Sequence, residues 1–458
     1  MGIRFLTREE VRDAAIGSLG KTFRELKDKN FNYNNKGTLG QLVERSVFKF
    51  ANNSRPEPDF ADAGIELKLT PYKINRDGTL SAKERLVLCL IDYMNEYKYS
   101  FENSCFLHKN KSIELLWYLY DKSKNKLDYI ITNEMYISLD DKEFEKDAEI
   151  IKSDWTFIIN KIIDGKAHEL SESDTMYLGA CPKGKNSSDK IQQPFNDILA
   201  MRRAFCYKVS YMTMLVRKYI AGERIEKIVK KPLKNQTFEE YIVKTVKKYY
   251  GKSESQLMKK LRIDTNAKNK FSIIFARMLK IDGDIENTEE FLKANIKVKT
   301  IRVENDGKIK ESMSFPAFKF EDIINEKWEE SYLYDTFENT KFMFVVFRKN
   351  DRDEYVFDRV KLWNMPEEVL QGEIKKVWLK TKKIIKSGKI VKSIKNGEKE
   401  TNFPKLTENK YCHVRPHAKN SRDTYILPVN DKLTGAKEYT KQCFWLNNSY
   451  IKSIIEEV

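Results

Sequence analysis

One short segment of the chain combines acidic and basic residues at a spacing suited to metal-assisted chemistry on a phosphate ester. It runs Pro58-Asp59-Phe60-Ala61-Asp62-Ala63-Gly64-Ile65-Glu66-Leu67-Lys68. In a strand, Glu66 and Lys68 leave the same face because they are two residues apart. Asp59 lies upstream of a turn that Gly64 can help to form, so we expect its carboxylate to converge on that face.

The chemistry predicted for this segment is metal-dependent hydrolysis. Two converging carboxylates are hard oxygen ligands of the kind that Mg²⁺ prefers. Bound Mg²⁺ polarises a scissile phosphate and lowers the pKa of a bound water molecule. Lys68 can orient that water or stabilise negative charge that builds up on the phosphate. The same spacing also fits a surface strand with an ordinary ion pair, so the pattern alone leaves both interpretations open.

A bare Glu-x-Lys pattern is weak, because the chain contains several other copies. We interpret four of them as solvated charges: Glu25/Lys27, Glu96/Lys98, Glu373/Lys375 and Glu408/Lys410. The Glu66/Lys68 copy differs from these in having an upstream Pro-Asp, an alternating strand pattern and an acidic residue, Glu44, on the preceding predicted helix.

The elements that must position these residues can be read from hydrophobic periodicity. Leu39 to Phe50 is predicted to be a helix, and Gly64 to Tyr72 alternates strictly, as a half-buried strand does. Arg85 to Tyr93 is a more continuous apolar run, which favours a central strand. Asp154 to Ile163 and Tyr207 to Ile220 are predicted helices. The fold class is therefore α/β, with a mixed sheet and flanking helices.

The chain repeats itself at long range. Four short matches recur in the same order, with offsets of 337 − 101 = 236, 378 − 155 = 223, 416 − 182 = 234 and 444 − 205 = 239. They are Phe101–Phe106 with Phe337–Phe342, Trp155 with Trp378, Pro182–Asp189 with Pro416–Asp423, and Phe205 with Phe444. We predict two copies of one fold, at 1–225 and 255–458, joined by a helical, lysine-rich linker at 226–254.

Composition points to a polyanionic partner. The chain has 458 residues, enough for two domains, and its 84 Lys and Arg against 68 Asp and Glu give a net charge of +16. Such a charge suits nucleic acid, because each phosphate that is neutralised releases a counterion. Charges interrupt every apolar run before the roughly 20 residues that span a bilayer, so we expect no membrane contact. Six scattered cysteines without a CxxC pair favour reduced thiols and a cytoplasmic protein, and make a zinc site improbable.

These motifs resemble a known family. Lys36-Gly37-Thr38-Leu39-Gly40-Gln41-Leu42-Val43-Glu44, then Pro58-Asp59-Phe60 and Gly64-Ile65-Glu66-Leu67-Lys68, resemble the catalytic signature of MutH, a mismatch-repair endonuclease that nicks DNA at GATC. Over nearly the whole chain, the closer likeness is to the two-domain type II restriction endonucleases of that family, which cut at GATC. Three further segments carry that likeness: Lys83–Leu88, Gly165–Glu172 and Cys412–His417.

The resemblance implies two tandem domains of the restriction-endonuclease (MutH-like) fold and a divalent cation, Mg²⁺, as cofactor. It places the active-site positions on Glu44, Asp59, Glu66 and Lys68, with the three carboxylates as metal ligands.

The resemblance also marks candidate DNA contacts. Lys36 and Gly37 fall where MutH approaches DNA, and Pro182 with Lys183 falls in the recognition-loop stretch. MutH has an arginine just before that proline, whereas this chain has Cys181, which puts the base contacts in doubt.

Lysines supply further candidate DNA contacts on physical grounds. Lys36, Lys183, Lys185 and Lys208 can meet phosphates or guanine edges, and Arg415 with Lys419 lies in the matching loop of the second copy. For each lysine, a solvated surface side chain is the competing interpretation.

The second copy lacks the metal-binding pattern. Glu290 matches Asp59 and Lys297 matches Glu66, both at an offset of 231 (290 − 59 and 297 − 66). The positively charged side chain of Lys297 therefore occupies the position where a metal cation would bind, which excludes the same metal site there. The helix predicted before it, Phe271–Leu279, offers no carboxylate equivalent to Glu44. We predict that this copy binds DNA without cutting it and acts as an effector, which could pair two protein molecules or loop DNA between two sites.

The sequence thus predicts a type II restriction endonuclease that hydrolyses double-stranded DNA at GATC. Two alternatives remain open at this point. One is a MutH-type nicking enzyme of mismatch repair, against which the tandem architecture argues, because the repair protein has a single copy. The other is a DNA-binding protein without catalysis, against which the intact Asp59–Glu66–Lys68 set argues.

Overall fold

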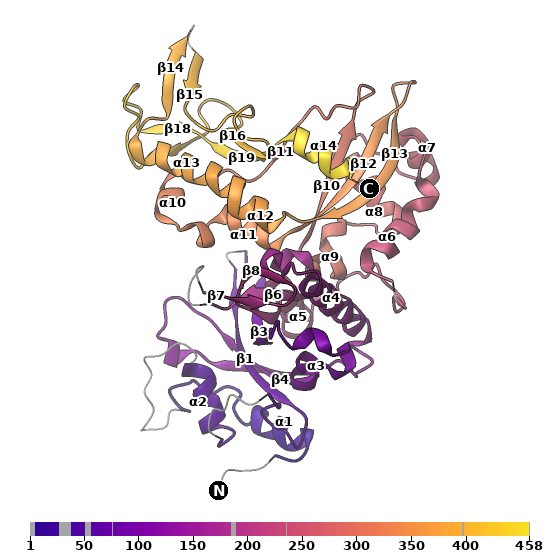
Figure 1. The fold of residues 1–458 in the computed structure, drawn as a ribbon, viewed down its shortest axis with the longest axis vertical. Coiled ribbons are helices and arrows are strands. Elements are labelled where there is room, and N and C mark those ends of the chain that lie inside the picture. Colours follow the sequence, from indigo (N-terminus) through magenta and orange to yellow (C-terminus); the bar gives the residue numbers. More distant parts are fainter. Residues whose placement is uncertain are drawn as a thin grey trace. The chain divides into compact units, whose positions relative to one another are not determined.

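The computed structural model describes residues 5–26, 38–50, 56–75, 77–184, 189–234, 236–395 and 398–457. The chain forms two compact units. The first consists of Met1–Tyr241 and Ile285–Asn295, and the second of Ile242–Asp284 and Ile296–Val458 (Figure 1). A short piece of the second sequence copy therefore belongs to the first unit. Among the described helices, none combines the length and the apolar character needed to cross a membrane.

The first unit is built on a four-stranded sheet in the order β2-β1-β4-β5. Its central pair, β1 and β4, is parallel, and the two outer strands pair antiparallel to them. The strands are β1 (Glu66–Ile74), β2 (Leu80–Ala82), β4 (Ser112–Leu119) and β5 (Ile131–Ser138). The predicted strand is confirmed as β1, which continues to Ile74. The expected half-buried alternation is not found, because Glu66 and Thr70 are buried as well as Leu67.

A second, three-stranded sheet in the order β3-β9-β6 carries the far end of the first unit, with the hairpin β7-β8 beside it. Its strands are β3 (Leu86–Leu90), β6 (Leu178–Pro182) and β9 (Arg203–Tyr207), and the hairpin is β7 (Lys190–Gln193) and β8 (Asn196–Met201). The prediction of a central strand near residues 85–93 was wrong, because β3 lies at an edge of this sheet. Its apolar run is explained by the packing of Leu86 and Leu88, both buried, rather than by strands on both sides.

Helices cover these sheets. Those of the first unit are α1 (Arg8–Ile16), α2 (Thr38–Ser46), α3 (Cys105–Asn110), α4 (Glu145–Ile163), α5 (Val209–Leu215), continued as a π-helix to Ile220, and α9 (Glu289–Ala294). Val11 of α1 and Val43 of α2 pack with Ile65 and Leu67 in one core cluster. The helix predicted over 154–163 is confirmed as the second half of α4. The helix predicted over 207–220 begins later, at Val209, because Tyr207 ends β9, and the helix predicted over 39–50 ends earlier, at Ser46.

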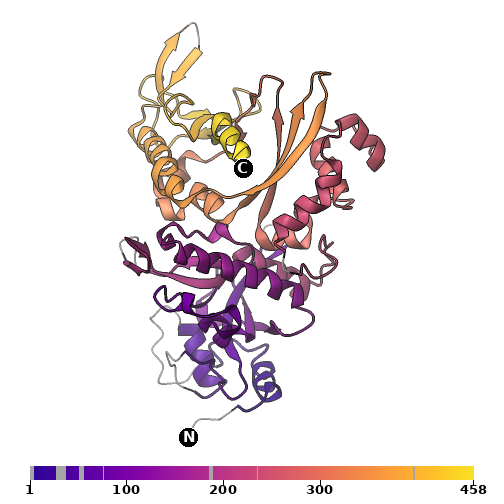
Figure 2. The ribbon, with the colours of Figure 1, turned by 45° about the vertical axis from the view of Figure 1, so that its right-hand side comes forward.

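The second unit repeats this plan. Its sheets run β10-β12-β13 and β11-β19-β16, with β10 parallel to β12, and Figure 2 shows the long strands of the first of these sheets side by side. The strands are β10 (Ile296–Val303), β11 (Met313–Ser314), β12 (Lys341–Lys349), β13 (Tyr355–Trp363), β14 (Val391–Lys395), β15 (Glu398–Thr401), β16 (Cys412–Pro416), β17 (Thr424–Ile426), β18 (Glu438–Thr440) and β19 (Gln442–Leu446).

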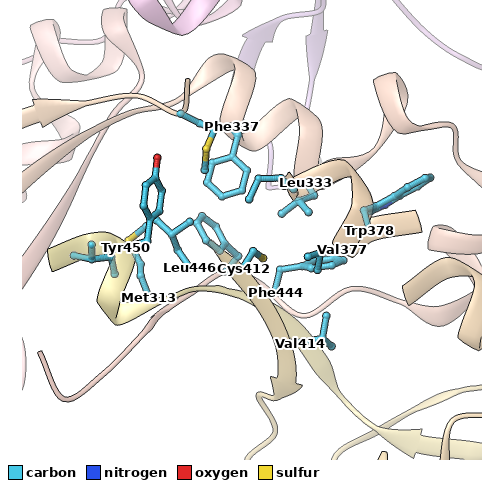
Figure 3. Close-up of a cluster of buried hydrophobic side chains, with 14 of the residues drawn as sticks. Met313, Leu333, Phe337, Val377, Trp378, Cys412, Val414, Phe444, Leu446 and Tyr450 are labelled. Carbon is cyan, nitrogen blue, oxygen red and sulfur yellow. The ribbon is translucent and has the colours of Figure 1, made fainter. Parts of the chain in front are cut away.

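Helices of the second unit enclose one large core. They are α7 (Glu254–Leu261), α8 (Lys270–Met278), α10 (Phe320–Asn325), α11 (Tyr332–Asn339), α12 (Glu367–Val369), α13 (Lys375–Ser387) and α14 (Asn448–Glu456), and α6 (Phe238–Val246) contains the point at which the chain passes from one unit to the other. Figure 3 shows Phe337 of α11 and Phe444 of β19 in this core, between Tyr450 of α14 on one side and Trp378 of α13 on the other.

The duplication predicted from the sequence extends to small details. The long helices α4 and α13 both end at a glycine with left-handed backbone, Gly165 at φ +70° and Gly388 at φ +64°. A Cβ at either glycine would lie within 2.8 Å of a backbone oxygen, that of Phe195 or of Asn430. The two copies therefore use the same close approach of chain to helix end, and tandem domains of one fold are confirmed.

Candidate active site

A tight turn brings the segment before β1 back against the start of the strand. Phe60 and Ile65 pair as an isolated antiparallel bridge, and the chain between them reverses through Gly64, which has φ +68°. A residue with a side chain is strained at that backbone conformation, which is why a glycine suits the position. The predicted role of Gly64 in the turn is confirmed.

This turn locks Asp59 and Glu66 together by reciprocal hydrogen bonds. The backbone N–H of Asp59 donates to Glu66 Oε2 at 3.1 Å, and the backbone N–H of Leu67 donates to Asp59 Oδ2 at 3.1 Å. Each carboxylate therefore orients the backbone that carries the other. The convergence predicted from the spacing is present in the structure.

Two lysines approach the same carboxylate oxygen. Lys68 Nζ donates to Glu66 Oε1 at 2.6 Å, and Lys109 Nζ lies 3.8 Å from that oxygen. Lys109 also donates to the backbone oxygen of Glu57 at 3.3 Å. Sequence reasoning missed Lys109, because it lies 41 residues beyond Lys68 (109 − 68) and reaches the site through the parallel pairing of β4 with β1, in which Glu66 is opposite Ile113. No local pattern encodes that pairing.

Burial and mutual repulsion raise the proton affinity of the carboxylates. Glu66 is only 2% exposed, and burial raises its pKa, an effect that Lys68 opposes and Asp59 reinforces. Glu44, on α2, is half-buried, and burial followed by the charge of Asp59 raises its pKa to about 7. Glu44 therefore belongs to the same electrostatic site as Asp59 and Glu66, as the sequence predicted. Like charges held together in this way favour a bound cation.

The donor set fits Mg²⁺ held partly by the protein. In the part of the chain that the structure describes, no three His, Cys, Asp or Glu side chains stand close enough to enclose a metal ion alone. Mg²⁺ typically takes one or two carboxylates and completes its shell with water and substrate phosphate. Asp59 and Glu66, held together and partly buried, match that requirement.

The predicted DNA-contacting residues have mixed outcomes. Pro182 is the last residue of β6 and Lys183 follows it, and both are exposed. Lys36, Gly37 and Lys185 lie outside the residues that the structure describes. Lys208 argues against its predicted role. It is 2% exposed, its Nζ donates to the backbone oxygen of Thr175 at 2.6 Å, and burial lowers its pKa.

One pattern dismissed from the sequence also needs correction. Glu96 was interpreted as a solvated charge, but it is buried and accepts hydrogen bonds from the backbone N–H of Phe106 at 3.2 Å and from Trp155 Nε1 at 3.1 Å. It thus ties α3 to α4 inside the first unit. The Glu-x-Lys spacing carried no information about that packing.

The matching positions of the second copy have other surroundings. Glu290 lies in α9, where it accepts backbone N–H groups of Ile228 at 3.0 Å and Val229 at 2.8 Å. Lys297 is exposed on β10, and α8, the helix predicted near residues 271–279, contains no carboxylate. Arg415 and Lys419 are exposed, with the Arg415 guanidinium 4.0 Å from the centre of the Trp445 ring.

Comparisons with known proteins agree with this geometry. A family model described as "DNA mismatch repair enzyme MutH" matches residues 48–154 and 279–375. The two matches begin 279 − 48 = 231 residues apart, the offset that relates Lys297 to Glu66. The chain is 36% identical to the type II restriction enzyme Sau3AI of Staphylococcus aureus, over 99% of each chain. It is 27% identical to the DNA mismatch repair protein MutH of Shewanella amazonensis, over 40% of this chain and 79% of that protein, and 26% identical to MutH of Shewanella baltica over the same shares.

Proposed function

The chain belongs to the MutH-like family of type II restriction endonucleases, and on that basis we propose that its first unit hydrolyses double-stranded DNA at GATC with Mg²⁺ as cofactor. As a member of this family it is a site-specific deoxyribonuclease. The proposed catalytic residues are Asp59, Glu66 and Lys68, with Glu44 as an additional acidic residue. The observation that carries the proposal is the reciprocal locking of Asp59 and Glu66, with Lys68 on the same carboxylate.

In the proposed mechanism the carboxylates of Asp59 and Glu66 would hold the cation, and Glu44 would add negative charge to the same site. When bound, Mg²⁺ supplies Lewis-acid activation of the phosphate and a more acidic water ligand. Lys68 Nζ is placed to hydrogen-bond the attacking water or the non-bridging phosphate oxygen, where negative charge develops. Lys109 adds a second positive charge beside Glu66 and so favours an approaching phosphate. In-line attack would leave a 5′-phosphate if the enzyme behaves like its relatives.

Digestion of plasmid DNA tests this function. The purified chain with millimolar Mg²⁺ is expected to cut both strands of unmethylated plasmid, and end sequencing is expected to place every cut at GATC. Cuts at another sequence would refute the specificity, and intact plasmid bound by the protein would support the DNA-binding alternative without catalysis. Nicks confined to one strand of hemimethylated sites would favour a repair enzyme, to which the tandem fold gives little support.

We further propose that the second unit is an effector domain that binds DNA without cutting it. Lys297 at the position of Glu66, the use of Glu290 as a backbone acceptor and the exposed Arg415 loop support this role. Binding of a second site by this unit would then promote cleavage and bring two sites together, either in one molecule or in a pair. A test is cleavage of plasmids with one or two GATC sites: two sites on one molecule should be cut faster, and equal rates at both would refute the effector role.

A further inference from the structure

Strand registers allow the two units to be compared residue by residue at the base of the recognition loop. In the first unit Leu86 of β3, Tyr207 of β9 and Leu178 of β6 lie opposite one another. In the second unit the same rung consists of Met313, Leu446 and Cys412. The offsets of the last two strands are 412 − 178 = 234 and 446 − 207 = 239. They equal the offsets of the Pro182/Pro416 and Phe205/Phe444 matches in the sequence repeat.

This register pairs four positions that differ in chemistry. Cys181 of the first unit corresponds to Arg415, and Cys206 corresponds to Trp445. Gly179 corresponds to His413, and Arg85, one residue before Leu86, corresponds to Ser312. Each unit therefore has one arginine in this set, but it comes from β16 in the second unit and from the residue before β3 in the first.

In the second unit these positions surround one cavity. Ser312, His413 and Arg415 line a space of about 310 Å³ together with Lys310, Lys405 and Asn448. The Arg415 guanidinium packs over the Trp445 ring, which fixes its plane. The positions that carry Arg85, Gly179 and Cys181 in the first unit are thus neighbours in the fold.

In the first unit the guanidinium of Arg85 is held by the carboxylate of Glu172, whereas that of Arg415 in the second unit packs on an aromatic ring. Arg85 Nη1 is hydrogen-bonded to Glu172 Oε2. Gly179 admits this carboxylate, because a Cβ there would lie 2.7 Å from Glu172 Cγ. Arg85 also acts on the thiols: the pKa of Cys181 is lowered by its hydrogen bond with Cys206, and the charge of Arg85 adds to that effect.

The ion pair is asymmetric in its exposure. The side chain of Glu172 is 1% exposed, whereas that of Arg85 is 31% exposed. The guanidinium is thus oriented by a buried carboxylate and is itself partly exposed. Arginine contacts the O6 and N7 atoms of guanine through such an oriented, planar fork.

We propose that Arg85, oriented by Glu172, is a specificity-determining residue of the first unit that reads a guanine edge of the target sequence. It supplies, from the residue before β3, the guanidinium that the second unit supplies from β16 as Arg415. This inference rests on the proposed function of the first unit as the cutting domain.

The test uses the full chain and three variants. These are Arg85→Lys, Arg85→Ser, and Arg85→Ser combined with Cys181→Arg, which installs the pattern of the second unit. Arg24→Lys serves as the matched control, because Arg24 is an exposed arginine paired with Asp128 elsewhere in the same unit. Each protein is assayed for kcat/KM on a GATC duplex, for kcat/KM on duplexes with the G·C pair or an A·T pair replaced, and for Kd on non-specific duplex.

Arg85→Lys keeps the charge but loses the planar fork, so kcat/KM on GATC should fall about 10- to 100-fold. The ratio of kcat/KM on GATC to kcat/KM on the duplex with a replaced G·C pair should fall by the same factor. The Kd for non-specific duplex should not change, and the control variant should behave like the wild type. Arg85→Ser should behave alike, and adding Cys181→Arg should recover at least a tenth of the lost kcat/KM. Unchanged discrimination, or an equal loss on every duplex, would overturn the inference. If the wild type cut no defined sequence, the proposed function itself would fail.

Discussion

Two strands at the same place in the fold, β1 and β10, carry side chains of opposite charge at one matching position. Each begins its sheet and pairs in parallel with the strand after the next helix, β4 or β12. β1 presents Glu66 and Lys68, whereas β10 presents Lys297 and Lys299. The change of charge sign at this position leaves the strand in place, because each strand is held by backbone pairing with its parallel neighbour.

The segments that precede these strands differ as well. Before β1 the chain makes a turn that aims Asp59 at the site, and before β10 it forms the helix α9. Within the first unit, Lys293 of α9 contacts both carboxylate oxygens of Asp147, at 2.6 and 2.7 Å, and Glu289 at 2.8 Å. The segment that corresponds to the Asp59 turn is thus a buried anchor of the first unit.

The largest expected effect comes from the pair Glu66 and Lys297. Glu66→Gln should reduce the single-turnover cleavage rate by about 10³-fold or more, because it removes a cation ligand. Lys297→Met, the matched change in the second unit, should leave that rate within about threefold. Rapid-quench assays with Mg²⁺ measure both cleavage rates. Comparable losses in the two variants would contradict the proposal that only the first unit cuts DNA.

A smaller effect is expected at Arg415. In a Glu66→Gln background, which binds DNA without cutting, Arg415→Ala should weaken binding of a second GATC duplex about tenfold. Lys327→Ala, a change at an exposed lysine paired with Glu330, is the control. Calorimetric titration resolves the two sites, and the effector role of the loop would be lost if both sites kept their affinity.

Asp59 and Glu290 share one alignment position but should respond in opposite ways. Glu290→Gln weakens two backbone hydrogen bonds to a buried carboxylate, so unfolding should become easier by about 2 kcal/mol, or roughly 4–8 °C in Tm. Cleavage at 25 °C should persist. Asp59→Asn should instead abolish cleavage with little change in Tm. Thermal melts beside plasmid digests separate the outcomes, and a stable Glu290→Gln protein would refute the anchoring role.

The smallest effect concerns the pH dependence of the metal-free protein. The pKa of Glu44 is raised from 4.5 to about 7, so the folded state binds the proton more tightly than the unfolded chain does. The associated stability is present below the unfolded pKa and is lost as pH rises through about 7. Glu44→Gln should therefore raise Tm at pH 8 by on the order of 2–4 °C and leave it unchanged at pH 4.5.

Addition of Mg²⁺ provides the control for this last prediction. Wild-type protein at pH 8 should gain stability when Mg²⁺ binds, because the cation offsets the carboxylate repulsion. Glu44→Gln should gain less. An equal gain in both proteins would show that Glu44 lies outside the cation's influence.

Local sequence patterns were enough to select the candidate site residues and to predict the tandem arrangement of the chain. Alternation placed Glu66 and Lys68 on one face of a strand, and repeated segments at nearly constant offsets predicted two copies of one mixed α/β fold. The alternation lies within one short segment, and the repeat is a recurrence of short segments. Both can therefore be recognised without knowing which strands pair. Comparison of the two copies also identified Lys297, because it replaces the carboxylate found at the matching position, Glu66.

Which distant side chains meet depends on the complete fold. The fold brings Lys109 to Glu66, buries Lys208 with its Nζ on the backbone oxygen of Thr175, places β3 at a sheet edge and joins Arg85 to Glu172. Each of these depends on strand order and on contacts between segments far apart in the chain. Such contacts are fixed by the packing of the whole unit, in which a one-residue change of register would point every side chain to the opposite face.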